Sequence, residues 1–175
     1  LKRNFGFTGE QSVVTLGLNA KLNELHAACA LASFESQEDI VSKNLERFLA
    51  YKKFTQDIPG LSWIEYSSEK SNYEFSLLYV DDQLFIERDL LVEILRKENA
   101  LARPYYSPPV HRTIDYPVDM HAPDLPVTEE LSKRIIQMPV GELVNMQDIH
   151  DMAELFRFIH LKSDEIRRRS KELLN

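Results

Sequence analysis

The sequence contains a single cysteine, Cys29, among its 175 residues. One cysteine excludes an internal disulfide and is consistent with a reducing compartment. No apolar run approaches the roughly 20 residues that a transmembrane helix needs, and no signal peptide is visible. We therefore expect a cytoplasmic protein that does not contact a membrane.

The sequence also has fewer basic than acidic residues, and it has few glycines. The formal net charge is −7, which argues against a nucleic-acid partner because such proteins favour basic patches. The basic run Arg167-Arg168-Arg169 lies among Asp164, Glu165 and Glu172, so we interpret it as a solvated helix face. None of the five glycines belongs to a phosphate-cradling loop, and a Gly-x-Ser-x-Gly nucleophile motif is absent.

Histidine and aspartate cluster late in the chain without a metal-ligand pattern. The cluster comprises His111, Asp115, Asp119, His121 and Asp124. Its spacing fits neither zinc nor calcium sites. The sequence therefore predicts no metal site.

Hydrophobic periodicity predicts several helices. Cys29 falls on the apolar face of the first helix, where a small buried residue is expected. Ser36 is the predicted N-cap of the second helix, and Thr128 and Asn145 are the predicted caps of later ones. Asn99 is the expected left-handed exit of the helix that ends at Glu98. The predicted helices are Asn23–Phe34, Ser36 to a point before Pro59, Glu87–Glu98, Thr128 to about Gln137, and Asn145 onward into the tail.

Three aromatic and apolar runs predict strands. Leu61–Tyr66 and Tyr73–Val80 are expected to pair antiparallel, and Leu101–Tyr106 is a third extended segment. Residues 107–126 contain five prolines and are predicted to form a long loop, which in compact domains is usually functional or disordered. This order of elements predicts an α+β fold with a small, mostly antiparallel sheet packed with helices.

Three stretches resemble one enzyme family. Arg3-Asn4-Phe5-Gly6-Phe7, followed by Gly17-Leu18-Asn19-Ala20-Lys21-Leu22-Asn23-Glu24-Leu25-His26-Ala27-Ala28, is similar to the DegT-type sugar aminotransferases, which use pyridoxal phosphate (PLP). Ala102–His111 and Leu125–Ile149 are similar to later segments of the same family. The resemblance implies that residues 1–35 end a large PLP-binding domain. Residues 36–175 would then form the small C-terminal domain of a fold-type I aminotransferase.

The resemblance implies that Asn19 binds the cofactor. In the family, the matching asparagine reaches the PLP phosphate of the neighbouring subunit, so the resemblance also implies a homodimer with a shared active site. An amide offers two N–H donors to phosphate oxygens. The alternative is that Asn19 only caps the helix that starts near Asn23. Lys21 stands where the family usually has arginine, and lysine lacks the bidentate fork of arginine.

The segment Arg103–His111 is a candidate substrate site. Aromatic rings stack on sugars or bases, and an imidazole hydrogen-bonds hydroxyl groups. The resemblance implies that Tyr105, Tyr106 and His111 border a nucleotide-sugar. The alternative is a proline-fixed loop whose tyrosines cover the sheet.

The Schiff-base lysine of the family precedes the Arg3–Phe7 region, where this sequence has only Lys2 in a different setting. PLP chemistry needs that amine, so we expect no catalytic residue in this chain and no PLP binding by the chain alone. The resemblance implies the C-terminal part of an aminotransferase that aminates a keto group on a nucleotide-linked deoxysugar, with glutamate as amino donor. The alternatives are a non-catalytic folded fragment or interaction module, and a dehydratase of the same family.

Overall fold

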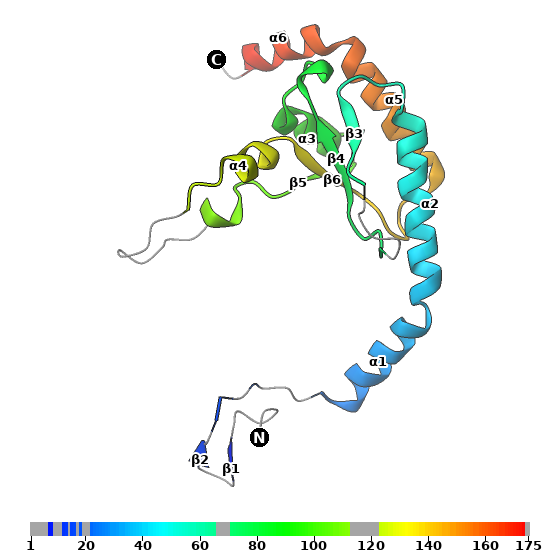
Figure 1. Cartoon of the computed structure of the whole chain (residues 1–175). Helices are drawn as coiled ribbons and strands as arrows, with labels where there is room; N and C mark the ends of the chain where they lie inside the picture. Colours follow the sequence, from blue (N-terminus) through cyan, green and yellow to red (C-terminus); the bar gives the residue numbers. More distant parts are fainter. Residues whose placement is uncertain are drawn as a thin grey trace. The chain divides into compact units, whose positions relative to one another are not determined.

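The structure is a computed structural model, and it describes residues 7–8, 12–13, 15–16, 18, 22–65, 71–112 and 123–173. The chain divides into two units, Leu1–Asp39 and Ile40–Asn175, and each is described by itself (Figure 1). The predicted domain boundary between residues 35 and 36 stays a prediction.

In its described residues, the first unit contains a short antiparallel pair and the helix α1. Strands β1 (Phe7–Thr8) and β2 (Ser12–Val13) pair with each other, and α1 spans Glu24–Glu35. The side chain of Asn23 caps α1 by accepting a hydrogen bond from the backbone N–H of His26 at 2.9 Å.

The prediction that Cys29 is buried is wrong, because Cys29 is exposed. None of the residues of α1 is buried by the described part of the chain. Within the described ranges, the apolar side chains of α1 therefore remain largely exposed.

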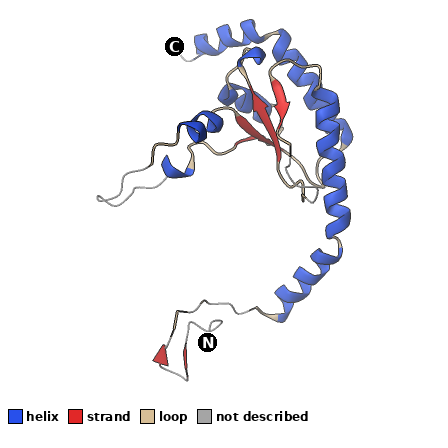
Figure 2. Cartoon of the chain, viewed as in Figure 1, coloured by secondary structure: helices blue, strands red, loops and turns tan. Residues whose placement is uncertain are grey.

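The second unit is built around a four-stranded sheet. Its strands are β3 (Leu61–Trp63), β4 (Ser76–Val80), β5 (Arg103–Pro104) and β6 (Ile135–Met138), in the spatial order β3-β4-β6-β5. All three pairings are antiparallel, and Leu78 of β4 faces both Trp63 of β3 and Ile136 of β6. The predicted α+β fold with a small antiparallel sheet is confirmed (Figure 2).

Helices supply most of the remaining core. The long helices are α2 (Gln37–Thr55), α3 (Arg88–Lys97), α5 (Met146–Leu161) and α6 (Ser163–Leu173). Shorter elements are α4 (Pro126–Ser132) and the 3₁₀ turns η1 (Asp82–Leu84) and η2 (Val110–Arg112). No helix within the described ranges combines the length and the apolar character that a membrane span requires.

The core lies where α2, α3 and α5 pack on the sheet. Its fully buried members include Tyr51 of α2, Leu91 and Leu95 of α3, Leu78 of β4 and Phe156 of α5. The Tyr51 hydroxyl donates to the carbonyl of Pro139 at 2.8 Å, and burial raises the pKa of Tyr51 far above its usual value. A buried polar group is thereby satisfied at the centre of the unit.

Local capping signals at two helix ends are confirmed. Asn145 caps α5 in a capping box, accepting from the Asp148 N–H at 3.0 Å while its own N–H donates to the Asp148 carboxylate at 2.8 Å. Asn99 leaves α3 at φ 64°, in the left-handed region where asparagine is tolerated. Ser36, in contrast, is the C-cap of α1, and its hydroxyl donates to the carbonyl of Ala32.

The predicted helix from Thr128 to Gln137 is wrong. Helix α4 begins at Pro126 and ends at Ser132, and Ile135–Met138 forms the inner strand β6. Ile135 and Ile136 are both buried. Adjacent residues of a strand point to opposite faces of the sheet, so both faces are covered at this inner strand, where β-branched residues pack well. Pairing with β4 and β5 therefore decides the conformation of this segment.

Candidate functional site

The candidate site starts where the chain leaves β5. The backbone N–H of Tyr105 donates to the carbonyl of Ile135 at 3.1 Å, which ties the end of β5 to β6. The rings of Tyr105 and Tyr106 stack with centroids 4.4 Å apart and an angle of 28° between their planes. The ring of Phe75 also contacts that of Tyr105, with centroids 5.8 Å apart, so the aromatic pair rests against a third ring.

His111 follows in η2 and is only 6% exposed. Its Nε2 lies 3.1 Å from Oε1 of Glu129 in α4. The guanidinium of Arg112 donates through Nε to the same oxygen at 2.9 Å. Arg112, and secondarily His111, hold the pKa of the Glu129 carboxyl below its usual range. Glu129 is therefore an ionised acceptor shared by two neighbours.

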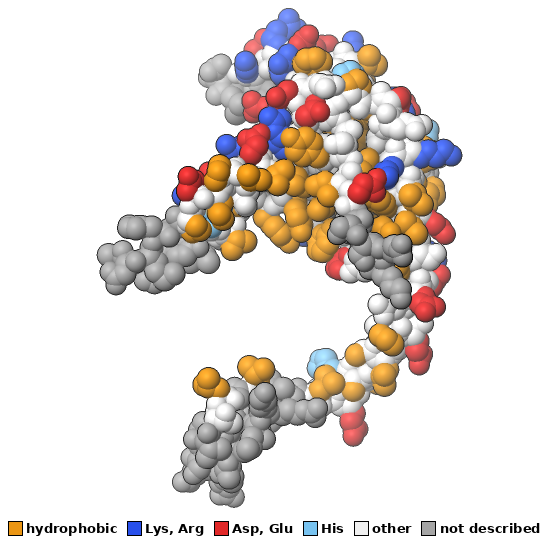
Figure 3. Space-filling view, in the orientation of Figure 1, with side chains coloured by type: hydrophobic (Ala, Val, Ile, Leu, Met, Phe, Trp, Pro, Cys, Tyr) orange, Lys and Arg blue, Asp and Glu red, His pale blue; other side chains and the backbone are white. Residues whose placement is uncertain are grey.

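Tyr105, Tyr106 and His111 line one cavity of about 490 Å³. Ile135 forms part of its wall, and because adjacent strand residues point to opposite faces, the cavity lies on the sheet face opposite the core residue Ile136. In Figure 3, hydrophobic side chains gather around the strands and α4 in this region. The remaining lining residues are mostly apolar: Pro109, Val110, Leu125, Thr128, Leu131 and Ser132.

The structure thus brings together the three residues that were predicted to bind substrate, and their role stays a prediction. Asn19, the predicted contact of the PLP phosphate, lies outside the described residues, as does Lys21. Within the described ranges, no group of three metal-ligating side chains is positioned to hold an ion.

Sequence reasoning missed the contribution of α4. Glu129 contacts His111 across 18 positions, and a proline-rich stretch separates the two in sequence. A contact of this kind leaves no periodic signal. The sequence predicts a helix cap at Thr128 and a family resemblance over Leu125–Leu131, but neither signal indicates the contact between Glu129 and His111.

Residues 2–157 match the DegT/DnrJ/EryC1/StrS aminotransferase family. The chain belongs to this family. Among its relatives is the dTDP-4-amino-4,6-dideoxy-D-glucose transaminase of Escherichia coli, which is 25% identical over 159 residues, covering 87% of this chain and 42% of the relative. The UDP-4-amino-4,6-dideoxy-N-acetyl-beta-L-altrosamine transaminase of Helicobacter pylori is 25% identical over 155 residues, covering 87% and 40%.

Solved structures of aminotransferases share the fold. The crystal structure of DesI in the presence of its TDP-sugar product superposes with a TM-score of 0.84 at 30% identity, covering 97% of this chain and 44% of that chain. The Helicobacter pylori aminotransferase PseC, involved in the biosynthesis of pseudoaminic acid, has a TM-score of 0.74 at 22% identity, covering 94% and 44%, and shows the fold alone. This chain therefore spans less than half the length of each of these relatives.

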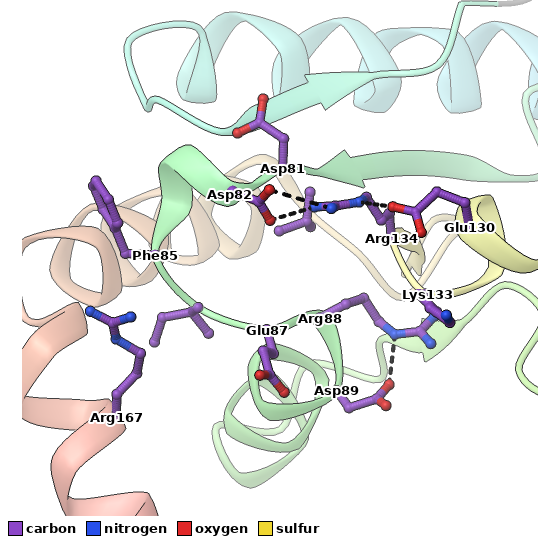
Figure 4. Close-up of a pocket in the computed structure, with 12 residues that line it drawn as sticks. Asp81, Asp82, Phe85, Glu87, Arg88, Asp89, Glu130, Lys133, Arg134 and Arg167 are labelled. Carbon is purple, nitrogen blue, oxygen red and sulfur yellow. Dashed lines mark hydrogen bonds and ion pairs between the residues drawn. The ribbon is translucent and has the colours of Figure 1, made fainter.

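A second cavity of about 600 Å³ lies between η1, α3 and the end of α4 and is lined by charged side chains (Figure 4). Arg134 donates to Asp82 at 2.8 Å and to Glu130 at 2.7 Å. These carboxylates raise the pKa of the Arg134 guanidinium, and Arg134 in turn lowers the pKa of Asp82. Arg88 is buried and paired with Asp89 at 2.6 Å. These arginines are already neutralised within the protein, so the cavity is a weaker candidate for an anionic ligand.

Proposed function

We propose that this chain is the C-terminal part of a PLP-dependent aminotransferase that aminates a keto group on a nucleotide-linked deoxysugar, with glutamate as amino donor. The observation that carries the proposal is that Tyr105, Tyr106 and His111 line the same cavity. The names of two relatives, both transaminases of nucleotide-linked amino-dideoxysugars, support the substrate class.

The chemistry of the cavity suits such a ligand. The stacked ring pair offers an aromatic face to a sugar or a base. Leu131 and Ile135 form an apolar wall, and a carbon without a hydroxyl can lie against such a wall without losing a hydrogen bond. His111 supplies a polar group to a hydroxyl at the same cavity.

The cofactor needs groups that this cavity lacks. Its described lining includes no lysine and no arginine, so these residues alone do not fit PLP and its phosphate. When bound, PLP supplies the electron sink for amino transfer. We place its Schiff-base lysine in the large domain, and we assign Asn19 to its phosphate across a homodimer interface. The residues of the cavity would bind and orient the sugar.

Calorimetric titration of the chain with dTDP-4-amino-4,6-dideoxy-D-glucose tests the proposal. Tyr106→Ala should weaken binding by about 0.5–1.5 kcal/mol, the contribution of an aromatic stack beyond area burial. Tyr106→Phe keeps the ring and should retain most of the affinity. Phe85→Ala removes an aromatic ring at the charged cavity instead, so it is the matched control. Equal affinities of Tyr106→Ala and Phe85→Ala would contradict the proposal.

A further inference from the structure

We propose that Glu129 is a positioning residue that holds His111 in a single tautomer, so that Nδ1 of His111 accepts a hydrogen bond from a hydroxyl group of the bound sugar. The inference rests on the proposed function and adds to it a residue and a direction of hydrogen bonding.

The first step concerns the proton on Nε2. Oε1 of Glu129 lies 3.1 Å from Nε2 of His111 and also accepts from Nε of Arg112 at 2.9 Å. An ionised carboxylate can only accept hydrogen bonds, and Arg112 keeps this one ionised by lowering its pKa. Nε2 must therefore carry the proton of this hydrogen bond.

The second step concerns the stability of this arrangement. His111 is 6% exposed, so its ring has little room to turn away from Glu129. The backbone carbonyl of Glu129 accepts from the Ser132 hydroxyl at 2.8 Å, which secures the last turn of α4. The Glu129 carboxylate itself is held by its contacts with Nε2 of His111 and Nε of Arg112.

The third step concerns the ring nitrogen of His111 that is available to the ligand. A neutral imidazole carries one proton, and with that proton on Nε2 the other nitrogen, Nδ1, presents a lone pair. A lone pair attracts hydroxyl and amino donors and repels a carbonyl oxygen. The keto group that is to be aminated should therefore lie away from His111, and a hydroxyl of the sugar should lie next to it.

The ring nitrogens of His111 report the tautomer directly in long-range ¹H–¹⁵N spectra of the full chain. The signals are assigned by their loss in His111→Gln, at about pH 8.5, two units above the ordinary imidazole value. The wild type should show a protonated Nε2 and an unprotonated Nδ1. Glu129→Gln should show a mixture, because an amide both donates and accepts.

Glu130→Gln is the matched control, since it removes the same charge from the next residue, which pairs with Arg134 instead. It should keep the wild-type tautomer. Circular dichroism verifies that each variant is folded. A protonated Nδ1 in the wild type, or an unchanged single tautomer in folded Glu129→Gln, would overturn the inference.

Binding of dTDP-4-amino-4,6-dideoxy-D-glucose gives the second readout. Glu129→Gln should weaken it about two- to tenfold, the scale of one lost hydrogen bond, while the affinity for dTDP alone stays the same. Equal binding by wild type and Glu129→Gln would overturn the inference and leave the proposed function standing. A wild type that binds no nucleotide-sugar would overturn the proposed function and the sugar contact together, whereas the tautomer result would still establish what Glu129 does to His111.

Discussion

At Gly60 the backbone has a conformation and a neighbour that a side chain would not tolerate. Its φ is +82°, and a Cβ would lie 2.2 Å from the backbone nitrogen of Leu84. The Gly60 carbonyl also accepts from the N–H of Asp81 at 2.9 Å, so the two segments are tied together. A glycine is required here both for its left-handed φ and for the close approach of η1.

Gly141 provides the comparison, because its φ is +116° and a Cβ there would meet nothing within 4 Å. We expect Gly141→Ala to lower the free energy of unfolding by about 1–3 kcal/mol through backbone strain alone. Gly60→Ala should lower it further, because backbone atoms must also move. Urea unfolding of both variants measures the difference, and equal losses would show that the close approach costs nothing.

The Glu129 carboxyl should make stability depend on acid pH. Because its folded pKa is lowered from the ordinary value of 4.5 by Arg112 and His111, its stabilising contribution is fully present above about pH 4.5 and is lost as pH falls through the lowered folded value. The unfolding midpoint of the wild type should exceed that of Glu129→Gln by a constant amount at neutral pH. This gap should close in acid, and a gap that widens in acid would contradict the assignment.

At the scale of elements, the sequence predicts best where the signal is local. Asn145 and Asn99 mark helix ends through side-chain chemistry that needs no distant partner, and both are confirmed. The run Tyr73–Val80 contains β4 because aromatic and apolar residues favour an extended chain. Strand β6 could not be predicted in the same way, since four residues after a helix carry too little periodicity and the pairing partners lie far away in sequence.

The same distinction between local signals and distant contacts applies to the candidate site. Tyr105, Tyr106 and His111 stand within one short, proline-bounded segment, so composition and family resemblance single them out. Their opposite wall comes from α4, and only the folded chain shows that Glu129 and Leu131 approach them.

Ile136 tests the role of β6 as an inner strand. It is fully buried and faces Leu78, so Ile136→Ala should lower the free energy of unfolding by about 2–5 kcal/mol. Val127 of α4, in contrast, is 71% exposed. Val127→Ala should therefore change the free energy of unfolding by no more than about 0.5 kcal/mol. Similar values for the two variants in urea unfolding would contradict the observed position of β6.

At the scale of the whole molecule, the exposed helix α1 bears on assembly. Leu25 and Leu31 are 73% and 66% exposed, and large exposed apolar patches favour association. We expect the average mass from light scattering to rise with protein concentration. Replacing both leucines with glutamate should suppress that rise.

Leu143→Glu is the control for this experiment, since Leu143 is 98% exposed but lies outside α1. It should leave association unchanged. A mass that stays monomeric over the whole concentration series would contradict the interface prediction for α1.

The strand order has a consequence for the chain while it is being made. β4 pairs with β3 on one side and with β6 on the other, but the stretch from Asp81 to Arg134 must leave the ribosome before β6 exists. At about 5–20 residues per second, synthesis of that stretch takes on the order of seconds. During this interval the second edge of β4 has no partner, and an open strand edge is a template for pairing with other chains. A chaperone that shields nascent strands would therefore act on this protein between the emergence of Val80 and that of Met138.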